Sequence, residues 1–509
     1  MVMSDLHIDG YSLKIEDVVS LFKESRRVNL TDDAKNKMNK SRKTIEKIIE
    51  NNNVVYGINT GFGSLSSVTI DANSLEELQS NLIRSHACGV GERMEPEHVL
   101  MMMLIRANSI AKGYSGTRIE VINLLISMIN NKIAPVIPRI GSLGASGDLA
   151  PLSHLALAMM GEGECNVLID GNWVVKNAID ALQIYNLKPI IFQAKEGLSL
   201  INGTSQMCTY LSIAISNMEH LVFAADASAS CSLEAIKGSH SPFDPLIHDV
   251  RPHLGQKISS ARIMGFVSNS DIQKSHVNCD RVQDAYSFRC APQVHGPIIE
   301  ILIEGRRMLE IELNSATDNP LVFSNEEKWD VISGGNFHGQ NLSLMSDYLA
   351  IACHELASIS ERRIEQILDP RWSGQKAFLT NKEGLESGLM IVQYVSASLI
   401  SELKLLSNPT SVGNVPVSNG KEDHVSMGAT GTYRTFISTK YLSLVLSNEL
   451  ICANEALNRI SEDPGNGVLI INNWLSKLVK PLTNDRSMTK DCEEVSKNLL
   501  LGNLSNLFR

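Results

Sequence analysis

The chain has 509 residues, 43% of them hydrophobic, which is enough to bury a large interior and to form more than one domain. Its formal net charge is −10, with both signs mixed along the chain, which excludes a typical nucleic-acid or anionic-membrane surface. Nine cysteines, an odd number without a Cys-x-x-Cys pair, favour a reducing compartment and no zinc framework.

Two features of the sequence bear on targeting and membrane insertion. The chain starts Met-Val-Met-Ser-Asp, without the apolar core of a signal peptide. The apolar run at residues 99–105 is far too short to cross a bilayer. We therefore expect a soluble, cytoplasmic protein.

The predicted elements change in character near residue 205. Before it, glycine turns separate short elements, and residues 166–169 and 173–175 flank Asp170-Gly171, which predicts a β-hairpin. After it, apolar residues recur every three or four positions, which predicts long helices at residues 353–368, 385–406 and 436–457. We expect a mainly α fold: an N-terminal lobe, residues 1–204, and a long-helix bundle, residues 205–509, that forms an oligomer core.

Two polar residues near the N-terminus lie beside glycine-rich loops. Tyr56 opens the segment Tyr-Gly-Ile-Asn-Thr-Gly-Phe-Gly, where a flexible backbone lets its hydroxyl project into a cleft as a base. A tyrosine packed at a turn is the alternative. His86 follows a helical run and Ser85, and precedes a pair of glycines. It is either a structural histidine or one that reaches a ligand.

Residues 141–154 read Gly-Ser-Leu-Gly-Ala-Ser-Gly-Asp-Leu-Ala-Pro-Leu-Ser-His, with Ala145-Ser146-Gly147 directly before a helix-like run. One interpretation is a glycine turn with Ser146 or Asp148 as the helix N-cap. The other is a compressed backbone, which these small residues permit because Gly147 has no Cβ and Ala145 adds only a methyl group.

Three further segments place polar or aromatic groups at helix breaks. Asn202, in Leu-Ile-Asn-Gly-Thr, offers both a donor and an acceptor. Phe337 lies in Gly-Gly-Asn-Phe-His-Gly, and Glu422 lies in Lys-Glu-Asp-His-Val-Ser. A plain turn needs none of these side chains.

Gln283, Tyr286 and Arg289 follow one another at helical spacing, so we expect their three polar heads on one helix face. Arg289 is suited to hold a carboxylate through two parallel hydrogen bonds. The alternative, a solvated face, is weak because Cys-Ala-Pro follows Arg289 rather than more charge.

Together, these segments resemble the aromatic amino acid ammonia-lyase family, in the family's order, from residue 56 to residue 428. The family's Ala-Ser-Gly tripeptide makes methylidene-imidazolone by closing into a five-membered ring with loss of water, while the serine hydroxyl leaves as a second water. The resemblance implies that Ala145, Ser146 and Gly147 form this group, whose methylene is an electrophile that no side chain supplies. It implies no metal, and His354-Glu355 does not complete a His-Glu-x-x-His pair.

Within the family, the segments at Tyr56, at Ser85-His86 and at Glu422 are similar to those of the histidine-specific members. These convert L-histidine into trans-urocanate and ammonia in histidine degradation. A tyrosine or phenylalanine lyase or 2,3-aminomutase with the same electrophile is the nearer alternative, and an inactive helical scaffold is the other. The sequence departs from the histidine-specific members at Gln340, at Lys421 and at Val-Gly-Asn (residues 412–414). These departures bear on the fine substrate specificity and not on the reaction class.

The resemblance also implies a role for each site residue and an assembly. The enzyme would be a homotetramer in which each active site draws residues from three subunits. The implied roles are a general base (Tyr56), contacts to the electrophile or the substrate amine (Asn202, Tyr286), a carboxylate ligand (Arg289), contacts to the imidazole (His86, Glu422), support of the polar network (Gln283) and cover over the ring (Phe337).

Overall fold

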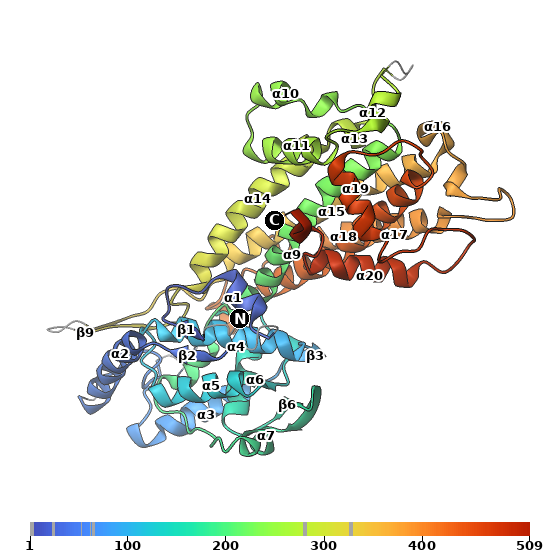
Figure 1. Ribbon diagram of the computed structural model, residues 1–509. Helices are drawn as coiled ribbons and strands as arrows, with labels where there is room; N and C mark the ends of the chain where they lie inside the picture. The colour runs from blue at the N-terminus through green and yellow to red at the C-terminus, as the bar shows by residue number, and fades with distance from the viewer. Residues whose placement is uncertain are drawn as a thin grey trace. The chain divides into compact units, whose positions relative to one another are not determined.

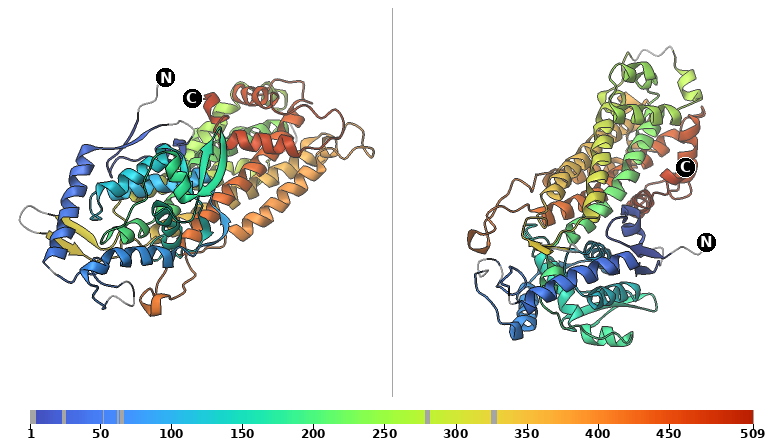
Figure 2. Two further views of the ribbon diagram at one scale, coloured as in Figure 1. Left: turned by 90° about the horizontal axis from the view of Figure 1, so that it is seen from below. Right: turned by 90° about the vertical axis from the view of Figure 1, so that its left-hand side faces the viewer.

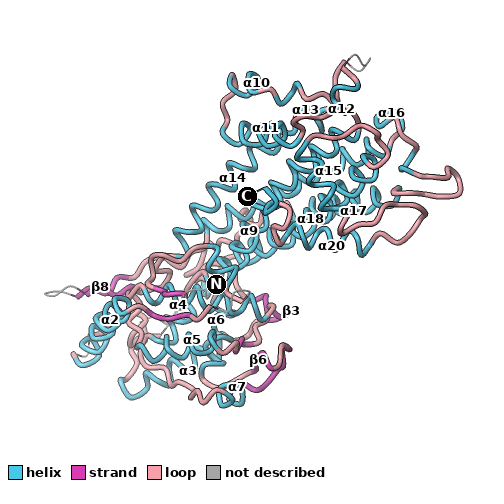
Figure 3. Tube along the Cα trace, viewed as in Figure 1, coloured by secondary structure: helices cyan, strands magenta, loops and turns pink. Residues whose placement is uncertain are grey.

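The structure is a computed structural model, and it describes residues 5–22, 26–51, 53–61, 63, 67–277, 282–324 and 329–508 (Figure 1). It is mainly helical, as the sequence predicts (Figure 3). The chain forms two compact units. Unit 1 comprises Met1–Ile213, Arg306–Ser346 and Pro409–Tyr433, and unit 2 comprises Ala214–Gly305, Asp347–Asn408 and Arg434–Arg509.

The division into units is not a single cut in the sequence. The expected lobe, residues 1–204, lies within unit 1, whereas residues 205–509 are shared between both units, because two later segments return to unit 1. Periodicity along the chain cannot show such returns. The chain passes between the units in a loop and within four long helices: α9 (Ser205–Ala235), α14 (Ala291–Leu313), α15 (Gln340–Leu368) and α18 (Gly428–Leu457).

Unit 1 contains all the strands of the described residues, and each of its sheets has only two or three strands. Its helices are α1 (Ile15–Ser20), α2 (Asp32–Glu50), α3 (Leu75–His86), α4 (Pro96–Ala111), α5 (Ile119–Asn130), α6 (Leu149–Met159), α7 (Ala178–Ile184) and α8 (Glu196–Ile201). Its strands are β1 (Leu6–Ile8), β2 (Val28–Leu30), β3 (Val90–Arg93), β4 (Ile133–Pro135), β5 (Pro138–Ile140), β6 (Glu164–Ile169), β7 (Asn172–Asn177), β8 (Leu321–Ser324) and β9 (Trp329–Ile332).

The core of unit 1 follows from apolar helix faces. In α4 every residue from Val99 to Ala111 is buried, so this helix is enclosed on all sides. A separate cluster joins Ile45 and Ile48 of α2 to Leu75 at the start of α3 and Val322 of β8. This packing fixes the helices that carry the polar residues described below.

The predicted hairpin is confirmed. Strands β6 and β7 pair antiparallel, closing at Ile169 and Asn172. Asp170 and Gly171, the two residues between them, both have positive φ angles, of 50° and 80°. That is the backbone of the tight turns that match the twist of paired strands.

The described residues of unit 2 form helices joined by loops and contain no strand. Besides its parts of the four long helices it contains α10 (Pro245–Asp249), α11 (Leu254–Phe266), α12 (Asp271–Ser275), α13 (Tyr286–Arg289), α16 (Pro370–Ser373), α17 (Met390–Leu406), α19 (Asn466–Leu475) and α20 (Thr489–Leu500). Its long helices lie side by side (Figures 1 and 2), and hydrogen bonds join α9 to α18 and α15 to α18.

Buried hydroxyl residues allow close packing of these helices. Ser230 of α9 and Ser438 of α18 are fully buried, and each donates to the carbonyl four residues earlier in its own helix. The helix itself thus satisfies the polar atom, and the small side chain leaves room for a neighbour.

Two sequence predictions in unit 2 need correction. The helix expected over residues 385–406 begins only at Met390, because Leu385 and Leu389 lie in the preceding turns. Gln283 does not share a helix with Tyr286 and Arg289, because α13 begins at Tyr286. Spacing alone cannot show that this helix has only four residues.

No helix in the described parts of the chain is long and apolar enough to span a membrane. Nor do these parts bring three or more His, Cys, Asp or Glu side chains together in a way that could hold a metal ion.

Candidate active site

A cavity of about 570 Å³ lies in unit 1 and is lined by residues far apart in the sequence. Five of the residues singled out from the sequence line it: Tyr56, His86, Ser146, Asn202 and Glu422. Leucine side chains of α3 and α8 supply much of the remaining wall. The cavity therefore combines an apolar lining with a few converging polar groups, as small-molecule sites do.

The tripeptide at residues 145–147 is held in a tight backbone cradle. Gly147 has a φ of +73°, and a Cβ built on it would lie 2.3 Å from the carbonyl oxygen of Gly203. Only glycine fits here. Asn202 Nδ2 donates to the carbonyl oxygen of Ser146 at 3.0 Å. Its Oδ1 is buried and has no hydrogen-bond partner among the described residues.

Asp148 does not act as a side-chain cap of α6, which begins at Leu149. Its carboxylate instead accepts hydrogen bonds from the backbone N–H of Gln206, at 2.7 Å, and of Met207, at 3.2 Å, in the first turn of α9. Burial raises the pKa of Asp148 to about 7, although these hydrogen bonds act in the opposite direction. Asp148 therefore occupies the N-cap position of α6, but its side chain does not cap that helix and instead ties the tripeptide to the start of α9.

Two later segments hold the loop that precedes the tripeptide. The carbonyl oxygen of Gly144 accepts from Gly339 N at 3.0 Å and from Ser426 Oγ at 2.9 Å. Met427 N donates to the Leu143 carbonyl oxygen at 2.7 Å. The segments of Phe337 and Glu422 thus contribute backbone and hydroxyl contacts that position the tripeptide.

His86 is the last residue of α3 and presents a defined tautomer. Its Nδ1 lies 2.8 Å from the carbonyl oxygen of Leu82, which can only accept, so Nδ1 carries the proton. Burial lowers the pKa of His86, although the Leu82 carbonyl and the Glu422 carboxylate act in the opposite direction. In the neutral ring, Nε2 is then an acceptor.

Tyr56 lies in the turn before the glycine-rich loop and is half-buried at the cavity wall. Burial raises the pKa of its hydroxyl, and the negative charge of Glu422 raises it further, whereas a hydrogen bond from the Gly63 backbone lowers it. The phenol therefore holds its proton in this environment unless a positive charge approaches it.

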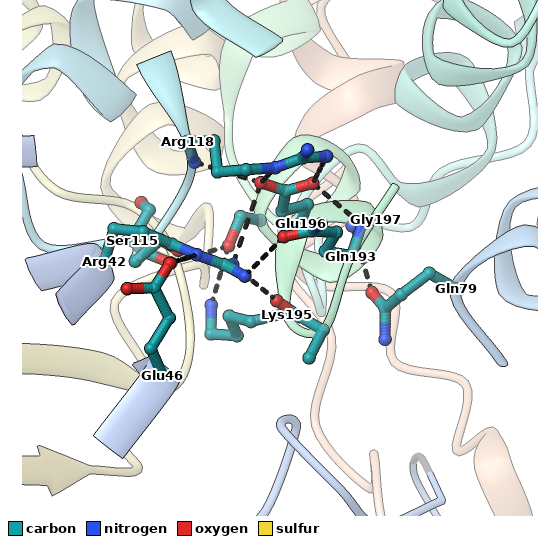
Figure 4. A network of polar contacts seen from close by, with 12 residues as sticks. Arg42, Glu46, Gln79, Ser115, Arg118, Gln193, Lys195, Glu196 and Gly197 are labelled. Atoms are coloured by element: carbon teal, nitrogen blue, oxygen red, sulfur yellow. Dashed lines mark hydrogen bonds and ion pairs between the residues drawn. The ribbon is translucent and has the colours of Figure 1, made fainter. Parts of the chain in front are cut away.

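Helix α8, which ends next to Asn202, is anchored at its start by buried charges (Figure 4). Glu196 is fully buried, and its carboxylate accepts from Arg118 Nε and Nη2, both at 2.7 Å. Arg42 lies 3.7 Å from the same carboxylate, and Gln79 Oε1 accepts from the Gly197 N–H at 3.0 Å. A helix of six residues is not stable alone, so these contacts fix the direction in which it presents Asn202.

Comparison with known proteins assigns the family. The sequence profile of the aromatic amino acid lyases matches residues 13–470. The chain is 44% identical to a histidine ammonia-lyase of Myxococcus xanthus over 98% of this chain and 97% of that protein. The chain belongs to the aromatic amino acid lyase family.

Solved structures of the family share this fold. The crystal structure of histidine ammonia-lyase from Trypanosoma cruzi matches with a TM-score of 0.92 at 36% identity, covering 99% of this chain and 94% of that one. A tyrosine aminomutase from Streptomyces globisporus matches with a TM-score of 0.90 at 33% identity, covering 99% and 98% of the two chains.

The lyase cavity of unit 1 does not contain all of the residues predicted from the sequence. Gln283, Tyr286 and Arg289 belong to unit 2, with Gln283 and Tyr286 exposed and Arg289 half-buried. Phe337 is in unit 1 and half-buried but is not part of the cavity lining. Five of the predicted residues thus line the cavity, Ala145 and Gly147 flank Ser146 in the chain, and the other four are not part of the lining.

The sequence analysis missed some of the polar residues at this lyase cavity. Asn81 and Ser85 line it from α3, one turn apart, and Ser418 lines it from the segment before Glu422. The spacing of Leu78, Asn81, Leu82 and Ser85 follows one helix face, which would have revealed the first two. No sequence pattern around Ser418 indicates a role at the cavity, because only the folding of the chain brings this residue there.

We expect Glu196→Gln to destabilise this lyase by about 3–5 kcal/mol, because Arg118 and Arg42 lose the buried negative charge that compensates them. Denaturant unfolding measures this loss. The matched control is Glu162→Gln, which removes the exposed partner of Arg84 and should cost about 0–1 kcal/mol. Equal losses in the two variants would contradict the anchoring role of Glu196.

We expect Glu422→Gln to lower the pKa of Tyr56, because the amide removes a negative charge that disfavours the phenolate. Ultraviolet titration of each protein, with and without Tyr56→Phe, isolates this one tyrosine by difference. The midpoint for Tyr56 should lie at lower pH in the Glu422→Gln background. An unchanged or higher midpoint would show that Glu422 does not act on Tyr56.

Proposed function

We propose that this lyase converts L-histidine into trans-urocanate and ammonia, as a step of histidine degradation. The observation that carries the proposal is the cavity in which His86 and Glu422 lie near Ser146 and Asn202. The full-length similarity to proteins named histidine ammonia-lyase supports it.

The chemistry requires an electron sink. The β-proton of an amino acid is weakly acidic and the amine is a poor leaving group, and no ordinary side chain supplies the missing electrophile. We propose that Ala145, Ser146 and Gly147 form methylidene-imidazolone. The Gly147 nitrogen bonds to the Ala145 carbonyl carbon with loss of one water, and Ser146 loses its hydroxyl as a second.

The residues around the tripeptide fit this group. The cradle at Gly147 excludes a Cβ, which favours the compression that ring closure needs. Asn202 donates to the Ser146 carbonyl oxygen, and its own buried Oδ1 is left as an acceptor for the tripeptide or the substrate amine. When formed, the group supplies an electrophilic methylene to the substrate.

The remaining polar groups of the cavity suit an imidazole. Neutral His86 offers an Nε2 acceptor and Glu422 offers carboxylate oxygens, so an imidazole or imidazolium N–H finds partners that a phenyl ring lacks. Tyr56 is the proton acceptor for the β-carbon. Because its environment raises its pKa, this role requires a nearby cation, and the substrate ammonium is one.

We further propose that the protein is a homotetramer in which other subunits complete the site, so that each site draws residues from three copies. The carboxylate ligand Arg289, with Tyr286 and Gln283, would come from unit 2 of another copy, and Phe337 would cover the substrate ring. The support for this is that Tyr286 is 70% exposed and that the buried Arg289 Nε has no partner among the described residues.

A tyrosine 2,3-aminomutase is the second candidate, because the Streptomyces globisporus tyrosine aminomutase covers nearly the whole chain. Such an enzyme needs the same electrophile and base. It differs in the groups that meet the substrate ring, so the choice depends on His86 and Glu422.

The purified protein should weigh two water molecules less than its sequence, with the loss confined to the peptide that contains residues 145–147. Intact-mass and peptide mass spectrometry measure this. The Ser146→Ala variant should fold normally. Because alanine has no hydroxyl to lose, this variant should form no methylene and should lose nearly all activity. An unprocessed peptide in active enzyme would overturn the proposed group.

L-Histidine should be preferred over phenylalanine by roughly 10⁴-fold in kcat/KM, because a phenyl ring would leave His86 and Glu422 unpaired. Tyrosine is the closer competitor, since its one hydroxyl can pair with His86. Glu422→Gln should therefore reduce histidine turnover far more than any tyrosine turnover. Parallel assays of the three amino acids decide this, and a preference for tyrosine would favour a tyrosine ammonia-lyase or aminomutase.

A further inference from the structure

Helix α13 carries two of the proposed site residues on a single turn of unit 2. It has only four residues, Tyr286–Arg289, with Ser287 and Phe288 buried and Tyr286 exposed. The Arg289 guanidinium carbon lies 4.6 Å from the centre of the Tyr286 ring, so the two functional side chains pack on each other. One helical turn does not persist by itself, so its geometry must be imposed from outside.

A fully buried ion pair of unit 2 supplies one such constraint. Arg363 of α15 and Glu449 of α18 are both 0% exposed, and Arg363 Nη2 donates to Glu449 Oε2 at 2.9 Å, alongside a second contact from Nε. The remaining terminal nitrogen, Nη1, donates to the carbonyl oxygen of Ser287 at 3.2 Å. That carbonyl belongs to the residue that follows Tyr286.

The carboxylate of the pair is itself fixed. Ser232 Oγ of α9 donates to Glu449 Oε1 and Ser360 Oγ of α15 donates to Oε2, both at 2.6 Å. Residues of three long helices therefore hold the guanidinium in one orientation. Its Nη1, which does not contact Glu449, can then point in only one direction, toward the Ser287 carbonyl. This is a property of the planar arginine fork that a lysine does not share.

A second anchor acts on the segment just before α13. Asp284 is buried, and its Oδ2 accepts from the backbone N–H of Ser239 at 2.6 Å. The backbone of Ala285 then accepts from both Phe288 N and Arg289 N. The turn is thus attached at Asp284 and at Ser287.

Stability alone is a weak reason for this arrangement. Burying two charges has a large desolvation cost, and well-packed apolar residues often serve as well or better. What apolar residues cannot do is donate a directed hydrogen bond to the Ser287 carbonyl. Because Ser287 lies between Tyr286 and Arg289 in the chain, this hydrogen bond is placed to fix the backbone that carries both side chains.

We propose that Arg363 and Glu449 are positioning residues for the reaction. They fix the Ser287 carbonyl, so that the Tyr286 hydroxyl and the Arg289 guanidinium are presented in one geometry to the substrate. This rests on the proposed function, because it takes Arg289 as the ligand of the substrate carboxylate.

The test is a double-mutant cycle between Arg363→Lys and Arg289→Lys, measured as kcat/KM for L-histidine on the full-length enzyme. Lysine at 363 keeps the charge beside Glu449 but cannot hold the carboxylate and the Ser287 carbonyl in the same geometry. We expect Arg363→Lys to lower kcat/KM by about 10- to 100-fold, chiefly through KM. In the Arg289→Lys background the same change should cost clearly less than in the wild type, because its effect through Arg289 is already lost and only its effect through Tyr286 remains.

Arg459→Lys is the matched control. Arg459, in the same unit, pairs with Glu455 at 2.8 Å and donates to the carbonyl oxygen of Thr380 at 3.3 Å, and neither partner belongs to α13. It should change kcat/KM less than about 2-fold, as expected for a site that shares no partner with the substrate ligands. An equal loss in this control, or additive losses in the cycle, would overturn the positioning role.

Two further measurements distinguish a loss of positioning from a loss of folding. The Arg363→Lys variant should keep the two-water mass loss, because the tripeptide lies in unit 1. If Arg363→Lys does not fold, the cycle is measured with Glu449→Gln in its place. If the wild type deaminates tyrosine or phenylalanine instead of histidine, the proposed function fails and the cycle is run with that amino acid. A wild type that deaminates none of the three overturns both proposals.

Discussion

The close contact between the backbones of Gly147 and Gly203 is the constraint on which the cavity depends. A Cβ on Gly147 would lie 2.3 Å from the Gly203 oxygen, and one on Gly203 would lie 2.0 Å from Arg106 Nη1. Neither residue can be replaced without moving backbone or a buried arginine. The contact sets Asn202, which precedes Gly203, against the Ser146 carbonyl, and the Asp148 N–H donates to Gly203 across the same junction. The geometry of the tripeptide therefore follows from packing two segments without side chains between them.

Buried arginine–carboxylate pairs recur where a short helix must be aimed. Glu196 with Arg118 lies at the start of α8, a helix of six residues, and Arg363 with Glu449 contacts α13, a helix of four. Helices this short have little stability of their own. In both places the guanidinium or carboxylate also meets backbone groups, so the charge pair defines a direction as well as a contact.

The environment of Tyr56 shows how the fold balances binding against proton transfer. Glu422 provides an acceptor for a substrate ring, yet its negative charge raises the pKa of the proposed base. Burial lowers the pKa of His86, which keeps the ring neutral and Nε2 an acceptor. A substrate that brings its own ammonium group reverses the balance at Tyr56, since it adds a positive charge that lowers the pKa of the hydroxyl.

The sequence by itself determined the features that depend on local signals. The β6–β7 hairpin follows from Asp170-Gly171, the long helices follow from apolar periodicity, and the motif residues were identifiable because chemistry requires unusual side chains at helix breaks. Only the tertiary structure decided which of them meet. Ser426 and Gly144 are hydrogen-bonded across 282 residues of sequence, and Gln283 lies outside the helix that its spacing suggested. Spacing reports one element at a time, whereas a site forms where separate elements pack, so the lining of the cavity and the two buried anchors could be read only from the folded chain.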